Sequence, residues 1–163
     1  MSYFTDLMDG CDAAVRDRLG EQERVITIGR CADVTTTGDL DSAGAGWTYV
    51  MVTDRRVHWV PHITNATDVC SLDLDRVRTC TELHRRHRSA LLMDHEPLVR
   101  LHFPPNGRPP NTTYTHGDPV LGSLSQTILG FSRPTAAAAE ALKDQLARRG
   151  LEIPQVERAD RLP

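Results

Sequence analysis

The clearest hydrophobic pattern lies near the centre of the chain, between residues 47 and 60. Two runs rich in β-branched and aromatic residues, 47–53 and 56–60, lie on either side of the polar dipeptide Asp54-Arg55. This composition favours pleated strands, and a break of two residues leaves room only for a tight turn. The pattern therefore predicts a β-hairpin over residues 47–60.

Short segments of the same kind recur before and after the hairpin. We expect further strands at 24–31, 69–72, 78–84, 90–93 and 98–103, and a short returning strand at 127–131. Such strands, separated by turn residues, are typical of an antiparallel sandwich or a small barrel.

The N-terminal segment has the periodicity of a helix instead. Apolar residues recur every three or four positions from Phe4 to Leu19, which predicts an amphipathic helix over residues 2–19 that ends at Gly20. Its apolar stripe is expected to pack on the body of the same chain. The alternative is that the stripe forms a contact between two copies of the protein.

A second helix is expected near the C-terminus. The alanine run 136–139 has high helix propensity, and Gly150 is a suitable residue to end the helix. The segment after Pro154 is charged and lacks a hydrophobic pattern, and we expect a flexible tail over residues 151–163. Residues 104–126 are rich in proline and polar residues and are predicted to be a long insertion.

Three short motifs point to a known family. Residues 19–25 read LGEQERV, residues 50–57 read VMVTDRRV and residues 72–77 read LDLDRV. In their order and spacing they resemble the "L-x-G-E-x-v" opening, the "vlTdrRl" hairpin and the "i-p-l-d-d-I" turn of bacterial pleckstrin-homology-like (PH-like) and GRAM-like domains.

The resemblance implies an α+β fold that is mainly β. We expect a PH-like seven-stranded antiparallel sandwich or barrel over residues 20–150, closed by a C-terminal helix, with an additional N-terminal helix at 1–19. Leu74 and Val77 would plug the bottom of the barrel. Thr53 and Asp54 would bind nearby backbone N–H groups and fix the hairpin.

The resemblance also implies a class of function. PH-like domains bind lipid head groups, peptides or proteins and are not generally enzymes, although a fold alone does not assign a function. Phosphoinositide-binding members use basic residues between the first two strands. Here residues 33–46 carry three aspartates and no basic residue, which argues against a phosphate site in that loop.

Charge and composition narrow the classes of partner. The net charge of −3 gives no general attraction to nucleic acid. No apolar run approaches the roughly 20 residues needed to span a bilayer, and residues 1–6 do not resemble a signal peptide. We therefore expect a cytoplasmic protein with no transmembrane segment, whose four cysteines are reduced.

Catalytic and metal-binding motifs are absent from the sequence. It contains no G-x-S-x-G, P-loop or G-x-G-x-x-G motif, and its seven histidines show no zinc-binding spacing. We expect no catalytic residue, metal or cofactor. The first hypothesis is therefore a non-catalytic protein-interaction or scaffold module that also self-associates. A small-molecule-binding or catalytic variant of the barrel is a further alternative.

The candidate binding residues lie in two segments. One is the basic turn Arg85, Arg86, His87 and Arg88, and the other is the proline-rich insertion, from which we select Arg108 and Tyr114. The basic turn could bind an anionic membrane surface, since each cation near such a surface contributes about 1 kcal/mol. Its alternative interpretation is a solvated hairpin tip.

Overall fold

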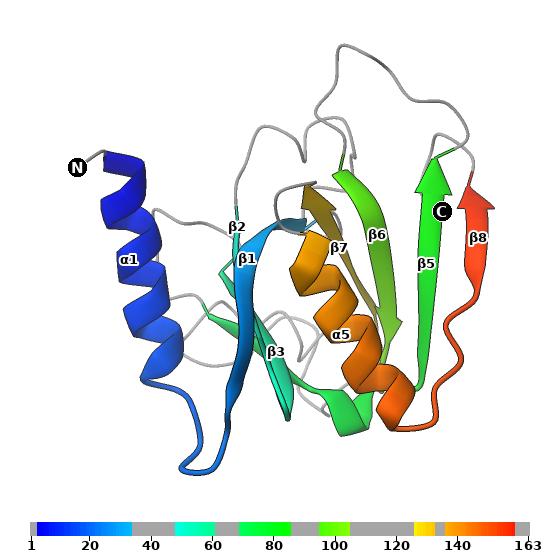
Figure 1. The fold of residues 1–163 in the computed structure, drawn as a ribbon, viewed down its shortest axis with the longest axis horizontal. Helices are drawn as coiled ribbons and strands as arrows, with labels where there is room; N and C mark the ends of the chain where they lie inside the picture. Colours follow the sequence, from blue (N-terminus) through cyan, green and yellow to red (C-terminus); the bar gives the residue numbers. More distant parts are fainter. Residues whose placement is uncertain are drawn as a thin grey trace.

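The computed structural model describes the chain in six segments, and its described part forms one curled sheet with two helices packed on it (Figure 1). The described residues are 3–33, 48–60, 69–85, 95–104, 126–132 and 136–158. The helices are α1 (Tyr3–Arg16) and α5 (Ala136–Arg148), with a 3-10 turn, η1 (Leu74–Arg76). The strands are β1 (Val25–Asp33), β2 (Thr48–Thr53), β3 (Arg56–Val60), β4 (Cys70–Asp73), β5 (Thr79–Arg85), β6 (His95–His102), β7 (Gln126–Ser132) and β8 (Gln155–Arg158).

The order of strands in the sheet is β4-β3-β2-β1-β7-β6-β5-β8. The pairs among β1 to β7 are all antiparallel, and only the pair of β5 with β8 is parallel. The expected fold is confirmed: seven antiparallel strands curl round a C-terminal helix, and an additional helix precedes them. The strand expected at 90–93 lies outside the described residues.

The predicted flexible tail is wrong over residues 155–158, which form β8. Glu82 N–H donates to Pro154 O at 2.9 Å, and the parallel register then runs from Glu82 with Gln155 to Arg85 with Arg158. A strand at the edge of a sheet is held by backbone hydrogen bonds and needs no apolar alternation. The hydrophobic pattern therefore contained no sign of it.

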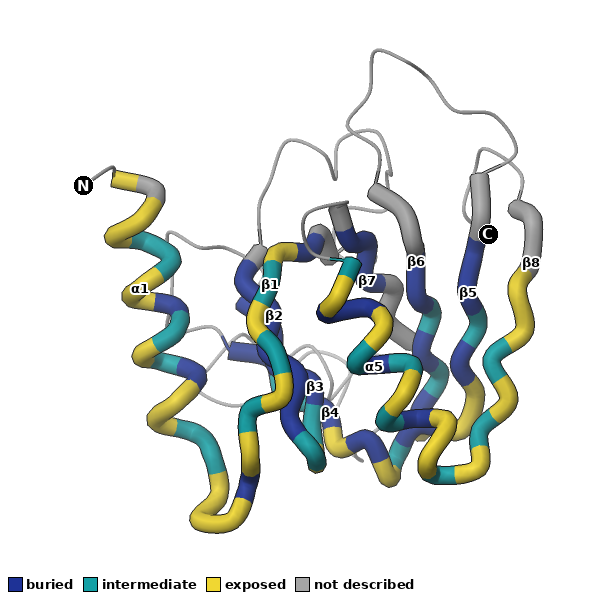
Figure 2. The backbone as a smooth tube through the Cα atoms, viewed as in Figure 1, coloured by how far each residue is buried: buried dark blue, intermediate teal, exposed yellow. Residues whose placement is uncertain are grey.

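The main core fills the space between the inner face of the sheet and α5. Trp59 of β3 and Phe131 of β7 are fully buried there, together with Leu142 and Leu146 of α5. Leu74 and Val77 are buried in the same core, as the resemblance implied. Figure 2 shows the buried side of α5 turned toward the strands.

A second, smaller core lies on the outer face of the sheet, under α1. Tyr49 and Met51 of β2 pack there with Cys11 and Val15 of α1. The next residues along β2, Val50 and Val52, belong to the main core, so β2 is buried on both faces. The apolar stripe of α1 thus packs on the body of its own chain.

Replacement of Tyr49 by phenylalanine tests the attachment of α1. The Tyr49 hydroxyl donates to Asp12, whose other oxygen accepts from Arg16 at 2.7 Å. Burial, followed by the hydrogen bond to Asp12, raises the pKa of Tyr49 above its usual range, so the hydroxyl stays protonated. Loss of a hydrogen bond to a charged group should lower the free energy of unfolding by about 1.5 kcal/mol, measured by urea denaturation. Tyr3→Phe, at an exposed site, should change it by less than about 0.5 kcal/mol.

Candidate functional site

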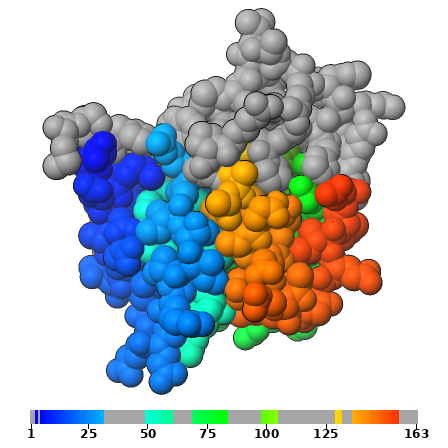
Figure 3. All heavy atoms as spheres, in the orientation of Figure 1, coloured from blue at the N-terminus to red at the C-terminus, as the bar shows by residue number. Residues whose placement is uncertain are grey.

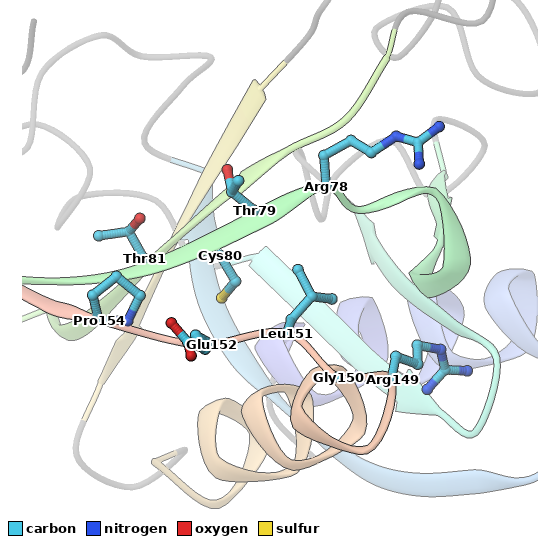
Figure 4. Close-up of a pocket in the computed structure, with 9 residues that line it drawn as sticks. All are labelled: Arg78, Thr79, Cys80, Thr81, Arg149, Gly150, Leu151, Glu152 and Pro154. Carbon is cyan, nitrogen blue, oxygen red and sulfur yellow. The ribbon is translucent and has the colours of Figure 1, made fainter.

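An open groove lies between β5 and the segment that joins α5 to β8 (Figure 4). Its volume of about 620 Å³ falls within the range of ligand pockets. The groove is bounded on one side by Arg78, Thr79, Cys80 and Thr81, and on the other by Arg149, Gly150, Leu151, Glu152 and Pro154. In the space-filling view, α1, β1, α5 and β8 succeed one another across one face of the molecule (Figure 3).

The end of α5 shapes one side of the groove. Gly150 has a φ of 85°, and its N–H donates to Ala147 O at 2.9 Å while Leu151 N–H donates to Leu146 O at 3.3 Å. These two bonds form a Schellman motif, which ends the helix and turns the chain away from its axis. Leu151 then packs against the main core, and the chain reaches β5 only at Pro154.

Gly150→Ala should lower the free energy of unfolding by about 1 kcal/mol, because a side chain is strained at this positive φ. A Cβ atom at Gly150 would meet nothing within 4 Å, so no steric clash adds to that cost.

A Cβ atom at Gly10, within α1, would also meet nothing within 4 Å, and Gly10 has no positive φ. Gly10→Ala should therefore stabilise the protein by about 0.5–1 kcal/mol. Thermal and urea unfolding of both variants would check the opposite signs.

The opposite side of the groove is an open stretch of sheet edge. The Glu82 N–H faces β8, since it donates to Pro154 O, and backbone polar groups alternate in direction along a strand paired with an antiparallel neighbour. Cys80, two residues earlier and opposite Leu101, therefore directs its N–H and C=O away from β6 and into the groove. Among the described residues, β8 pairs with β5 only from Glu82 onward.

Arg149 lies at one end of the groove, where it serves as an anchor. Its Nε donates to Asp75 Oδ1 at 2.9 Å, its Nη1 to Gln145 O at 2.9 Å and its Nη2 to Asp54 O at 2.8 Å. These bonds tie the end of α5 to η1 and to the turn between β2 and β3. Arg78 and Glu152, which also line the groove, are both exposed.

The Cys80 side chain points from β5 into the main core, on the opposite side of the strand from Thr79 and Thr81 (Figure 4). Burial raises the pKa of its thiol to about 12, although the positive charge of Lys143 opposes the shift. The thiol is therefore protonated at neutral pH and is a poor nucleophile.

A buried polar cluster lies beside the second core, near the end of α1. The carboxylate of Glu23, with 1% of its side chain exposed, accepts from Arg56 Nη2 at 2.5 Å and lies 3.0 Å from His58 Nε2. It also accepts from Thr53 Oγ1 at 3.2 Å, and the other ring nitrogen of His58 lies 2.7 Å from Ser71 Oγ. The cluster fixes the β2–β3 hairpin to the segment before β1.

Thr53 makes the contacts in the turn between β2 and β3 that the sequence predicts. Thr53 Oγ1 accepts from the N–H groups of Arg55 and Arg56 at 3.1 and 2.9 Å. Asp54 Oδ1 accepts from Arg24 N–H at 2.9 Å, so the Asp54 carboxylate holds the residue just before β1 rather than its own turn.

The charge state of Glu23 predicts a loss of stability in acid. Burial raises its pKa, but the hydrogen bonds and charges of Arg56 and His58 outweigh this effect and bring the net pKa below the ordinary 4.5. A carboxylate with a depressed folded-state pKa stabilises the protein above its unfolded-state pKa, and that stabilisation is lost as the pH falls through the folded-state value. The free energy of unfolding should therefore fall more steeply below about pH 4.5 in the wild type than in Glu23→Gln, by urea denaturation at each pH.

The predicted binding residues fall almost entirely outside the described part of the chain. Arg85 ends β5 and is opposite Arg158 of β8, while its side chain, and the whole of Arg86, His87, Arg88, Arg108 and Tyr114, are not described. None of the groove residues was predicted. The two sides of the groove lie about 70 residues apart in sequence. The only sequence signal for it is that the helix-ending Gly150 is followed by the apolar residues Leu151 and Ile153, which return the chain to the core.

Comparison with solved structures finds two similar chains. The chain is similar to the hSac2 domain from human phosphoinositide phosphatase Sac2, with a TM-score of 0.50 and 11% sequence identity, over 97% of this chain and 91% of that one. The chain adopts a PH-like fold. A Vps36 N-terminal PH domain also matches, with a TM-score of 0.47 and 16% identity, over 82% of this chain and 86% of that one. No protein-family model matches the sequence, and no curated protein does.

Two features are absent from the described residues, a membrane-crossing helix and a metal-binding cluster. Neither helix there has the length and apolar character needed to cross a membrane. No group of three or more His, Cys, Asp or Glu residues is arranged there to hold a metal ion.

Proposed function

We propose that this protein is a non-catalytic PH-like module, of the bacterial GRAM-like type, that serves as a cytoplasmic adaptor by binding a protein partner. The partner contributes an extended peptide segment, which lies in the groove beside β5. The observation that carries the proposal is the sheet edge at Cys80, whose N–H and C=O point into a groove of about 620 Å³.

An extended peptide matches the chemistry of this edge. Its own N–H and C=O groups can pair with those of Cys80, as in the addition of a strand to an exposed sheet edge. The same edge already accepts a strand, since β8 pairs with β5 immediately beyond the groove. Leu151 and Pro154 supply apolar surface for side chains, and Arg78 and Glu152 supply a charge of each sign.

The groove is less suited to the competing functions. A phosphate head group is best bound by cations with donors to spare, whereas the Arg149 guanidinium already donates to Asp75, Gln145 and Asp54. The Cys80 thiol is buried with a raised pKa, which disfavours nucleophilic catalysis. These observations support a binding module over a lipid-binding or catalytic site in this groove.

Peptides selected against the whole folded chain from a random library test the proposal. We expect a bound peptide to change the NMR amide signals of Thr79–Thr81 and Leu151–Pro154 most. Arg78→Glu with Glu152→Arg, which reverses both exposed charges of the groove, should change the affinity for charged peptides. Arg148→Glu alters an exposed residue that pairs with Asp144 on α5 and should leave binding unchanged.

The same experiment has an outcome that contradicts the groove. Ile26 and Ile28 of β1 are 44% and 42% exposed and form a separate apolar surface. Signal changes centred on these two residues, or peptides that perturb neither side of the groove, would show that the partner binds elsewhere. Sedimentation of the chain with anionic vesicles but no selected peptide would favour a lipid partner instead.

A further inference from the structure

The outer face of β5 and β6 carries a polar cluster of which only the two threonines of β5, Thr79 and Thr81, also line the groove. Thr81 of β5 is directly opposite Arg100 of β6, and Thr79 is directly opposite His102. Side chains of residues opposite each other in an antiparallel pair lie on the same face of the sheet. Because Thr79 and Thr81 point to the opposite side of β5 from Cys80 (Figure 4), this cluster lies away from the main core.

Arg100 is the unusual member of the cluster. Its Nε atom is buried and has no hydrogen-bond partner. Other charged groups with little exposure in the described chain are paired: Glu23 with Arg56 and His58, and Glu82 with Lys143. A buried donor without a partner is costly, and such a group calls for an explanation such as an ion or ligand.

The charges around Arg100 favour an anion. Glu82, the nearest acidic residue along β5, is bound 3.0 Å from Lys143 of α5 on the inner side of the sheet. The other outer positions of these strands whose side chains are described, Leu83 and Leu98, are apolar and are opposite each other. Among the side chains of β5 and β6 that the structure describes, none thus places a carboxylate on this face beside Arg100.

His102 also bears on the electrostatics of the face. Burial, and then the positive charge of Arg100, lower its pKa below the ordinary 6.5. The imidazole is therefore neutral at pH 7, and it can donate one N–H without a second positive charge. Thr79 faces it from β5, and Gln126 is opposite it on β7.

We propose that Arg100, Thr81 and His102 form a binding site for an oxyanion, a carboxylate or a phosphate group. The guanidinium supplies a planar pair of donors that matches such a group, the Thr81 hydroxyl supplies a third donor, and the His102 ring a fourth. The anion would satisfy the buried Nε of Arg100. Thr81 also lines the peptide groove, but Arg100 and His102 do not, so this site does not depend on the peptide proposal.

Titration with inorganic phosphate tests the site in the full chain. Sodium phosphate at pH 7 should produce saturable changes in the NMR signals of the Thr81 and His102 amides and of the Arg100 Nε–H, beyond those caused by sodium chloride at the same ionic strength. Arg100→Gln should weaken phosphate binding about 10- to 100-fold, the effect of losing a charged hydrogen-bonding group. Arg148→Gln, at an exposed arginine of α5, should leave it unchanged.

Two further readouts separate an oxyanion site from a merely structural arginine. Bound phosphate should raise the pKa of His102, because a negative charge nearby favours the imidazolium, and it should raise the Tm of the wild type but not of Arg100→Gln. Arg100→Lys keeps the charge but loses the planar pair of donors, so it should bind phosphate more weakly than the wild type.

A parallel arm identifies the source of the anion. Vesicles of phosphatidylserine and phosphatidylcholine that sediment the wild type but not Arg100→Gln would indicate a lipid head group, and phosphate binding without sedimentation would indicate a soluble or protein-borne group. Both results support the site. Signal changes that are the same in chloride and in phosphate, or phosphate binding that Arg100→Gln retains in full, would overturn it.

Discussion

Glu23→Ala is expected to lower the free energy of unfolding by about 3–5 kcal/mol, the usual cost of removing one partner of a buried ion pair. The Glu23 carboxylate accepts from Arg56 and Thr53 and contacts His58, which is fully buried. Without it, the Arg56 guanidinium loses its carboxylate and the His58 ring loses the contact at its Nε2. Urea denaturation at pH 7 measures the change.

Two control variants separate the cluster from the general effect of losing a glutamate. Glu21→Ala, at an exposed site two residues earlier, should change the free energy of unfolding by less than about 0.5 kcal/mol. Glu23→Gln keeps an acceptor but not the charge, so its loss should lie between the other two. A loss below about 1 kcal/mol for Glu23→Ala would contradict the assignment of Glu23 as the link between the hairpin and the α1–β1 segment.

Trp59→Ala should also lower the free energy of unfolding by about 3–5 kcal/mol, through lost apolar burial and the cavity that remains. Trp59 is fully buried in the main core, on the side of β3 that faces away from α1. Its removal should loosen the packing between the sheet and α5. Thermal and urea unfolding measure the loss.

An exposed aromatic residue provides the comparison for Trp59. Tyr3, at the start of α1, is 74% exposed, so Tyr3→Ala should change the free energy of unfolding by less than about 0.5 kcal/mol. Similar effects of the two variants would show that Trp59 is not a central residue of the core.

The sequence was sufficient to predict elements whose signal is local. The β2–β3 hairpin has two runs rich in β-branched and aromatic residues around a two-residue break, and Thr53 binds the turn as predicted. The helix-ending role of Gly150 followed in the same way from residue type and position. In each case the residues that determine the structure lie within a few positions of one another.

Features that depend on contacts distant in the sequence were not predicted. Glu23 lies in a polar turn and looks solvated in the sequence, but it meets Arg56 and His58, 33 and 35 residues later. Strand β8 is held by the edge of β5, and the groove exists only because α5 returns the chain to that edge. The sequence likewise does not indicate that the Nε atom of Arg100 is buried without a hydrogen-bond partner, because this depends on residues of the neighbouring strands.

The amide hydrogen exchange of Cys80 tests the proposed peptide groove most directly. In the unbound protein its N–H points into an open groove, so it should exchange faster than the N–H of Thr81, which faces β6. Peptides selected against the chain should slow the exchange of Cys80 and leave Thr81 nearly unchanged. An amide of Cys80 that exchanges slowly without peptide, or at the same rate with and without it, would contradict pairing of a peptide with this edge.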